Sequence, residues 1–126
     1  MRVETAFDNI ELDGRERQAL DRGISRIERR ARLFPPELAR LTVRIAGHGR
    51  PHPKLAEVRV TLANPARVIE ARAENREVAA AIHEAFEELE RQLERLKSDL
   101  RGEKTWRRRQ RRERLRRRHP PHGPVL

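Results

Sequence analysis

The sequence predicts an α+β fold: a four-stranded mixed sheet with two helices packed on one of its faces. Four segments alternate polar and apolar residues, the period of a half-buried strand, whereas two others repeat apolar residues every three or four positions, the period of an amphipathic helix. Along the chain these segments follow the order β-α-β-β-β-α. The 126 residues leave room for a single domain with a modest core.

The first two elements are a strand and a helix. Polar residues or alanine separate the inward side chains of the strand, Val3, Thr5 and Phe7. Asp13 is placed to cap a helix over about residues 14–32. The apolar stripe of this helix consists of Leu20, Ile24, Ile27 and Ala31. Gly23 costs the helix about 1 kcal/mol relative to alanine, and Pro35-Pro36 prevents it from continuing.

Three further strands follow, joined by short connections. The inward residues of the second strand are Leu41, Val43 and Ile45, and those of the third are Ala56, Val58, Val60 and Leu62. The fourth strand spans about residues 67–73, and its inward residues are Ile69, Ala71 and Ala73. The Pro- and Gly-rich segment 47–53 is predicted to be a loop, and Asn64-Pro65 a turn.

A long amphipathic helix follows the strands. Its stripe steps by three or four residues and comprises Val78, Ile82, Phe86, Leu89, Leu93, Leu96 and Leu100. These positions predict a helix of about 25 residues, roughly 37 Å long. Because a helix joins the first two strands, they should be parallel, whereas short links make the others antiparallel. Both helices should then cover one face of the sheet.

The basic charge fits nucleic acid, an acidic membrane or an acidic protein as a partner, and the choice of arginine favours nucleic acid. The chain has 30 Lys+Arg against 20 Asp+Glu, a formal net charge of +10, and 27 of the 30 cations are arginines. Arginine binds phosphate with two hydrogen bonds and stacks on bases. Residues 103–126 hold ten basic and two acidic residues, so the sequence predicts a nearly balanced domain, 1–102, and an arginine-rich tail, 103–126. We expect this tail to be flexible or to extend the last helix to about Arg118.

Several other classes of function are disfavoured. Without cysteine there is no disulfide, thiol nucleophile or Cys-rich zinc site. His48 and His52 lie in the loop without an evident third ligand, so we predict no metal and no cofactor. The carboxylates sit on exposed helix faces beside arginines, which argues against an enzyme with a small-molecule substrate. No apolar run approaches the length of a membrane span, and we expect a soluble cytoplasmic protein.

The candidate RNA-binding residues lie on the polar faces of both helices. On the first helix Arg15 and four further arginines fall within a sector of about 100°, opposite the apolar stripe. The last helix carries two arginines facing away from its stripe and two cations flanking it. The predicted contacts are Arg22, Arg26, Arg29, Arg30, Arg91, Arg95, Lys97 and Arg101. A charged helix face is often only a solvated face, but cations on two helices and a tail favour RNA.

Three segments carry a resemblance to a known family. They are Ile24-Ser-Arg-Ile-Glu-Arg29, Lys54-Leu-Ala-Glu-Val58, and Ala79-Ala-Ala-Ile82 followed by Leu89-Glu-Arg-Gln-Leu-Glu-Arg-Leu-Lys97. In this order, from about Val3 to Arg101, the chain resembles the ribosome hibernation-promoting factors, a family of ribosome-associated translation inhibitors that are sigma-54 modulation protein-like. The resemblance implies a fold similar to a double-stranded-RNA-binding domain. It also implies binding to the small ribosomal subunit and its ribosomal RNA near the decoding centre, which inhibits translation under stress or in stationary phase.

The resemblance also assigns positions. The basic helix positions of the family match Arg26, Arg29, Arg91, Arg95 and Lys97. The sequence departs from the family pattern at three positions: Gly23 stands where relatives often have lysine, Glu94 where a cation is frequent, and Val78 where an aromatic residue is usual. These departures imply weaker binding at the first helix. Long members add a dimerisation domain for which 126 residues leave no space, so we expect a short form that is a monomer.

The tail and the function each keep an alternative. The tail is either a disordered solubilising segment or an arm along ribosomal RNA, with contacts from Trp106, Arg107, Arg108, Arg109, Arg111 and Arg112. The whole chain could instead be a general structured-RNA-binding or RNA-chaperone module. A third interpretation uses the long apolar stripe as a coiled-coil seam for a protein partner. A peptide-release activity is disfavoured, because the sequence has no Gly-Gly pair for the catalytic loop that such factors need.

Overall fold

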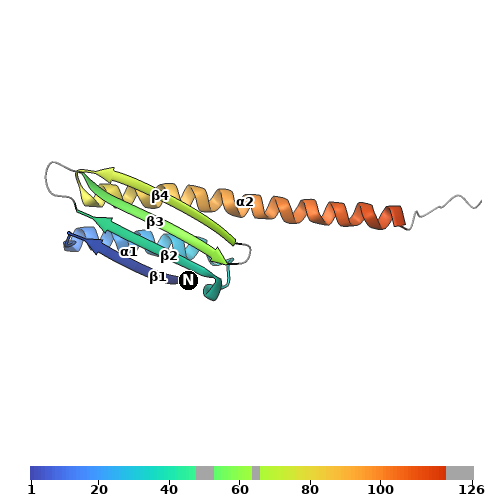
Figure 1. Cartoon of the computed structure of the whole chain (residues 1–126), viewed down its shortest axis with the longest axis horizontal. Helices are drawn as coiled ribbons and strands as arrows, with labels where there is room; N and C mark the ends of the chain where they lie inside the picture. Colours follow the sequence, from blue (N-terminus) through green and yellow to red (C-terminus); the bar gives the residue numbers. More distant parts are fainter. Residues whose placement is uncertain (48–52, 64–65, 119–126) are drawn as a thin grey trace, which may run out of the picture. The chain divides into compact units, whose positions relative to one another are not determined.

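The computed structural model describes residues 1–47, 53–63 and 66–118, except for the side chains of residues 104–107 and 116–118. The elements are β1 (Arg2–Asp8), α1 (Gly14–Arg30), the 3-10 turn η1 (Pro36–Leu38), β2 (Ala39–Ala46), β3 (Lys54–Ala63), β4 (Ala66–Asn75) and α2 (Val78–Arg118) (Figure 1). Most of the predicted loop at 47–53 and the predicted turn at 64–65 lie outside the described residues.

The strands form one mixed sheet in the order β1-β2-β3-β4. β1 and β2 are parallel and are joined through α1, whereas β2, β3 and β4 are antiparallel to their neighbours. In Figure 1, α1 and the beginning of α2 lie on one side of the sheet. The α+β prediction, with its four-stranded mixed sheet and two helices, is therefore confirmed.

The core lies between the sheet and the helices. The inward residues predicted for the second and third strands are buried, and both helical stripes are buried at nearly every position, with Ile27, Ile82 and Phe86 at 0% exposure. The inner face of β1 differs, because Phe7 is 42% exposed. β1 is an edge strand, and the helices cover this part of the inner face least.

α1 begins where its capping signal predicts. The side chain of Asp13 accepts a hydrogen bond from the Glu16 backbone N–H at 2.8 Å, and the Glu16 side chain accepts one from the Asp13 N–H at 3.0 Å. This reciprocal pair satisfies two of the N–H groups that a helix start leaves free. The helix ends at Arg30, two residues before the predicted end and well before the prolines.

Gly23 is required by packing against α2. A Cβ atom at this position would lie 2.6 Å from two ring atoms of Phe86, far inside van der Waals contact. The aromatic ring occupies the space that a side chain would need, so the helix accepts the lower propensity of glycine. Position 23 faces the core, and its glycine therefore removes no cation from the outer surface of α1.

The chain divides into two units, Met1–Glu94 and Arg95–Leu126, each described by itself. The first holds the sheet, α1 and the beginning of α2. α2 itself runs 41 residues, beyond the 25 that the apolar stripe predicts, and it ends at Arg118, where the expected helical extension of the tail ends. It crosses the expected domain boundary at residue 102 without a break. A single glycine, Gly102, does not end a helix rich in Arg, Glu, Gln and Leu. No proline occurs between Gly102 and Pro120 that would break the helix.

Candidate nucleic-acid interface

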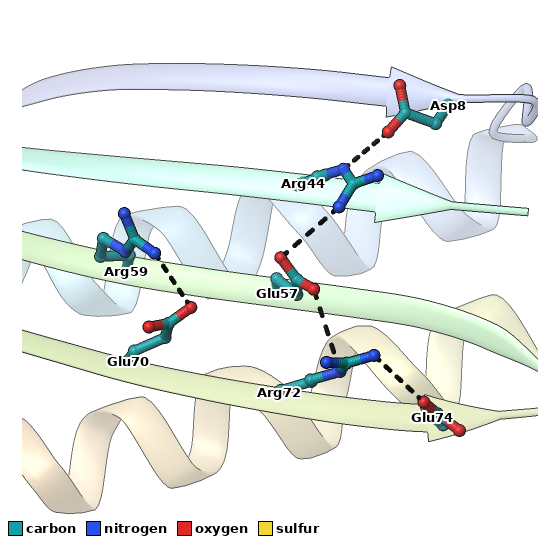
Figure 2. Close-up of polar contacts among 7 residues, drawn as sticks. All are labelled: Asp8, Arg44, Glu57, Arg59, Glu70, Arg72 and Glu74. Carbon is teal, nitrogen blue, oxygen red and sulfur yellow. Dashed lines mark hydrogen bonds and ion pairs between the residues drawn. The ribbon is translucent and has the colours of Figure 1, made fainter.

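The sheet face that the helices leave uncovered carries a connected network of ion pairs (Figure 2). Arg44 Nε lies 2.6 Å from Asp8 Oδ2, and Arg44 Nη1 lies 3.8 Å from Glu57 Oε2. Arg72 continues the network, with Nε 3.8 Å from Glu57 Oε1 and Nη2 3.4 Å from Glu74 Oε1. The network thus reaches from β1 to β4.

Strand register produces this network. Arg44 pairs with Glu57 across β2 and β3, and Glu57 with Arg72 across β3 and β4, so opposite charges stand side by side. The hydrogen bond to Asp8, and then the charge of Asp8, raise the pKa of Arg44 above its ordinary value. Further pairs on this face are Arg59–Glu70, Arg2–Glu4 and Arg40–Glu4.

These pairs join five arginines to five carboxylates, and the face is electrically balanced. A surface of matched charges offers little net attraction to a phosphate backbone. The candidate nucleic-acid interface therefore lies on the helical side of the first unit and on the second unit.

On α1, two of the predicted contacts are open to solvent. Arg22 and Arg29 are exposed, and neither forms an ion pair with any residue that the structure describes. They lie at an open hollow of about 380 Å³ on the surface of the helix. Its lining residues are Gln18, Asp21, Arg22, Ser25, Arg26 and Arg29. Three guanidinium groups and two neutral polar side chains are suited to a phosphate, with Asp21 as the one opposing charge.

The two other predicted contacts on α1, Arg26 and Arg30, form ion pairs with carboxylates of α2. Arg26 Nε lies 3.0 Å from Glu90 Oε1; both atoms are inaccessible to solvent, and the contact lacks the alignment of a hydrogen bond. Arg30 Nη1 donates to Glu94 Oε1 at 3.0 Å, and its Nε lies 3.7 Å from Glu90 Oε2. Arginines of α1 therefore form ion pairs with glutamates in the first part of α2. The two helices do not present one continuous basic surface here.

Arg91 is also paired. Its Nη1 donates to Glu88 Oε2 at 3.1 Å, and its Nη2 lies 4.0 Å from Glu87 Oε2. The side chain is nevertheless 63% exposed, so these are surface contacts that contribute little stability and can exchange for a phosphate.

The remaining predicted contacts belong to the second unit. Arg95 and Arg101 are exposed, and Lys97 is half-buried. Lys97 and Arg101 each have a polar or charged partner. The four exposed arginines of the predicted tail contacts are Arg108, Arg109, Arg111 and Arg112. For Trp106 and Arg107 the structure describes the helical backbone but not the side chains.

The structure changes how the charge divides. Met1–Glu94 contains 17 basic and 17 acidic residues, whereas Arg95–Leu126 contains 13 and 3. The net charge of +10 therefore belongs entirely to the second unit. The sequence-based division at residue 102 gives the first part a net charge of +2, whereas the unit that ends at Glu94 carries no net charge. The available signal was the acidic run of α2, in which five glutamates stand between residues 84 and 94.

Comparison with known proteins now identifies the family. The family model for sigma 54 modulation protein / S30EA ribosomal protein matches residues 3–101. The chain belongs to this family. S30EA-family proteins are ribosome-associated and non-enzymatic, so this chain is a ribosome-associated protein and not an enzyme. No curated protein matches the chain in sequence.

Two solved structures share the S30EA-family fold. The N-terminal domain of Protein Y from Thermus thermophilus is 22% identical with a TM-score of 0.59, and the alignment covers 76% of this chain and 99% of that one. A ribosomal subunit interface protein from Coxiella burnetii is 18% identical with a TM-score of 0.59, and the alignment covers 78% and 99%. At these identities the likeness establishes the fold alone.

The described part of this S30EA-family chain contains no cluster of three His, Asp or Glu residues suited to a metal ion. His48 and His52 lie outside the described residues. No helix within residues 1–47, 53–63 and 66–118 is long and apolar enough to cross a membrane.

The ion pairs between α1 and α2 should limit RNA binding. Replacing Glu90 and Glu94 by glutamine frees Arg26 and Arg30, and one additional phosphate contact should tighten binding about fivefold near physiological salt. The matched control is Glu57→Gln with Glu70→Gln, which makes the same change in net charge on the opposite sheet face. Filter binding to small-subunit RNA would compare them. Equal tightening by both double variants would mean that only net charge matters.

Proposed function

We propose that this S30EA-family protein is a ribosome hibernation factor. It binds the small ribosomal subunit near the decoding centre, contacts ribosomal RNA there, and inhibits translation in the cytoplasm under stress or in stationary phase. The observation that carries the proposal is the family match over residues 3–101, which spans every strand and both helices of the first unit.

The contacts are made by cations of both units. On α1, Arg22 and Arg29 are ready to receive phosphates, because no described carboxylate occupies them. Arg26, Arg30 and Arg91 join them when phosphate oxygens replace their carboxylate partners. On α2 beyond residue 94, Arg95, Lys97 and Arg101 extend the contacts, followed by the arginines of residues 103–126.

The test is binding to purified subunits combined with translation in vitro. Replacing Arg22 and Arg29 by glutamine removes two phosphate contacts and should weaken small-subunit binding about 20-fold near physiological salt. Inhibition of translation should weaken in parallel. The control, Arg59→Gln with Arg72→Gln, removes the same charge from the uncovered sheet face and should change binding little. Failure of the protein to prefer the small subunit, or to inhibit translation, would refute the proposal.

A general structured-RNA-binding module is the second candidate, favoured by the concentration of the net charge in the second unit. Such a charge attracts any RNA without regard to sequence. This candidate predicts equal affinity for small subunits and for an unrelated RNA duplex at the same salt concentration. In either case we expect a monomer, which analytical ultracentrifugation of the free protein would check.

A further inference from the structure

We propose that the arginine-rich end of α2 acts as a helix enclosed by RNA, with phosphate backbones on two opposite sides of it. This inference deepens the proposed function and rests on it for the identity of the RNA. It concerns the described side chains between Arg108 and Leu115, a stretch in which five of eight residues are arginine and one is acidic.

The first observation is that these cations surround the helix. At about 100° per residue, the five arginines leave no free sector wider than about 140°. Arg109 and Arg112 centre about 160° away from Arg111 and Arg114, and Arg108 lies between the two pairs. All five side chains are exposed. A helix that lies on RNA with one face needs cations on that face alone.

The second observation is that carboxylates within the same segment do not neutralise this charge. Arg108 and Arg112 are four residues apart, and Arg111 and Arg114 three, spacings at which like charges repel. Within residues 108–115, Glu113 is the one carboxylate, and it has no ion pair with any described residue. Phosphates on both sides would relieve the repulsion on both sides, whereas phosphates on one side would leave half of it in place.

RNA is the partner that this chemistry fits. An acidic protein surface could satisfy charge, but contact on opposite sides of one helix needs a partner that surrounds it. Two phosphate backbones, in an opened groove or between neighbouring RNA helices, provide such walls. The cations of the segment are all arginine, whose planar fork binds phosphate through two hydrogen bonds.

The first experiment compares opposite sides of the helix in the full-length protein. One variant carries Arg109→Gln and Arg112→Gln, and the other carries Arg111→Gln and Arg114→Gln, so each loses two charges. Enclosure predicts that both weaken binding to protein-free small-subunit RNA by about 20-fold, and that both flatten the salt dependence by about 1.4–1.8 in log–log slope. If one variant binds like the parent, the helix lies on RNA with one face and the proposal is wrong.

The second experiment tests whether the segment binds as a helix. Gln110→Pro keeps every cation but breaks the helix at its centre, and Gln110→Ala is the matched control. Enclosure of a rod predicts at least tenfold weaker binding for the proline variant and unchanged binding for the alanine variant. Equal binding by the two variants would show that the segment binds as a flexible chain, which overturns the proposal.

Both experiments are repeated with intact small subunits and with an unrelated RNA duplex. Losses on both sides that occur with intact subunits but not with protein-free RNA would point to an acidic ribosomal protein and overturn enclosure by RNA. Equal affinity of the parent protein for subunits and for the unrelated duplex would instead refute the hibernation proposal. In that case, losses on both sides with either RNA would still support the enclosed helix.

Discussion

Deletion of residues 103–126 is expected to weaken binding to the small ribosomal subunit by a factor on the order of 100 or more near physiological salt. The deleted segment holds ten basic and two acidic residues, and the domain that remains carries a net charge of only +2. Each lost phosphate contact lowers affinity about fivefold under these conditions, so the loss of three contacts is sufficient. Sedimentation with subunits over a range of salt concentrations measures both the loss and the flatter salt dependence.

The deletion should leave the fold intact, which separates binding from folding. The family match ends at residue 101, and the core residues of the first unit all precede the deleted segment. Thermal unfolding of the truncated protein should therefore resemble that of the full chain. A loss of affinity below about threefold would place the decisive contacts on α1 and the earlier part of α2, and would assign the tail to solubility.

Replacing Phe86 by alanine is expected to lower the free energy of unfolding by about 3–5 kcal/mol, the usual cost of removing a fully buried aromatic side chain. Phe86 is 0% exposed, and its ring lies where α1 has glycine in place of a side chain. No neighbouring side chain at position 23 can move in to fill the cavity. Urea unfolding followed by circular dichroism would measure the change.

A double-mutant cycle with Gly23→Ala tests the contact itself. Alone, Gly23→Ala forces a methyl group to within 2.6 Å of the ring and should destabilise the protein by about 1–3 kcal/mol, despite a gain in helix propensity of about 1 kcal/mol. With Phe86→Ala already present the clash is absent, and the same substitution should be neutral or stabilising. Additive effects of the two substitutions would show that Gly23 and Phe86 do not pack as described.

The elements of the fold were predictable from local patterns. Alternation identified all four strands and the buried faces of β2 and β3, whereas the predicted inner face of β1 is largely exposed. The capping signal placed the start of α1 at the observed residue. The length of α2 was less predictable. The change in charge suggested a boundary at residue 102, but one of the two expectations for the tail, a helical extension to about Arg118, is confirmed. Residues 103–118 are mostly good helix formers.

The sequence predicted which cations could belong to the candidate interface. It predicted less well which of them are unpaired on the folded surface. The wheel of α1 correctly placed Arg22 and Arg29 in solvent. It could not indicate that Arg26 and Arg30 meet Glu90 and Glu94, because those glutamates lie more than 60 residues away in sequence. The contribution of each of the eight helix cations to RNA binding remains a prediction.

The sequence alone determined three features of this protein: its arginine content, the order of its elements and its two apolar stripes. Composition and periodicity are properties of single residues and their near neighbours, so they can be read without the tertiary structure. Tertiary structure decided which of those charges are available to a partner. Pairing across the sheet neutralises its uncovered face, and pairing between helices occupies part of α1, because an ion pair forms wherever folding brings opposite charges within about 4 Å. The first unit contains as many acidic as basic residues, so the whole net charge lies in Arg95–Leu126.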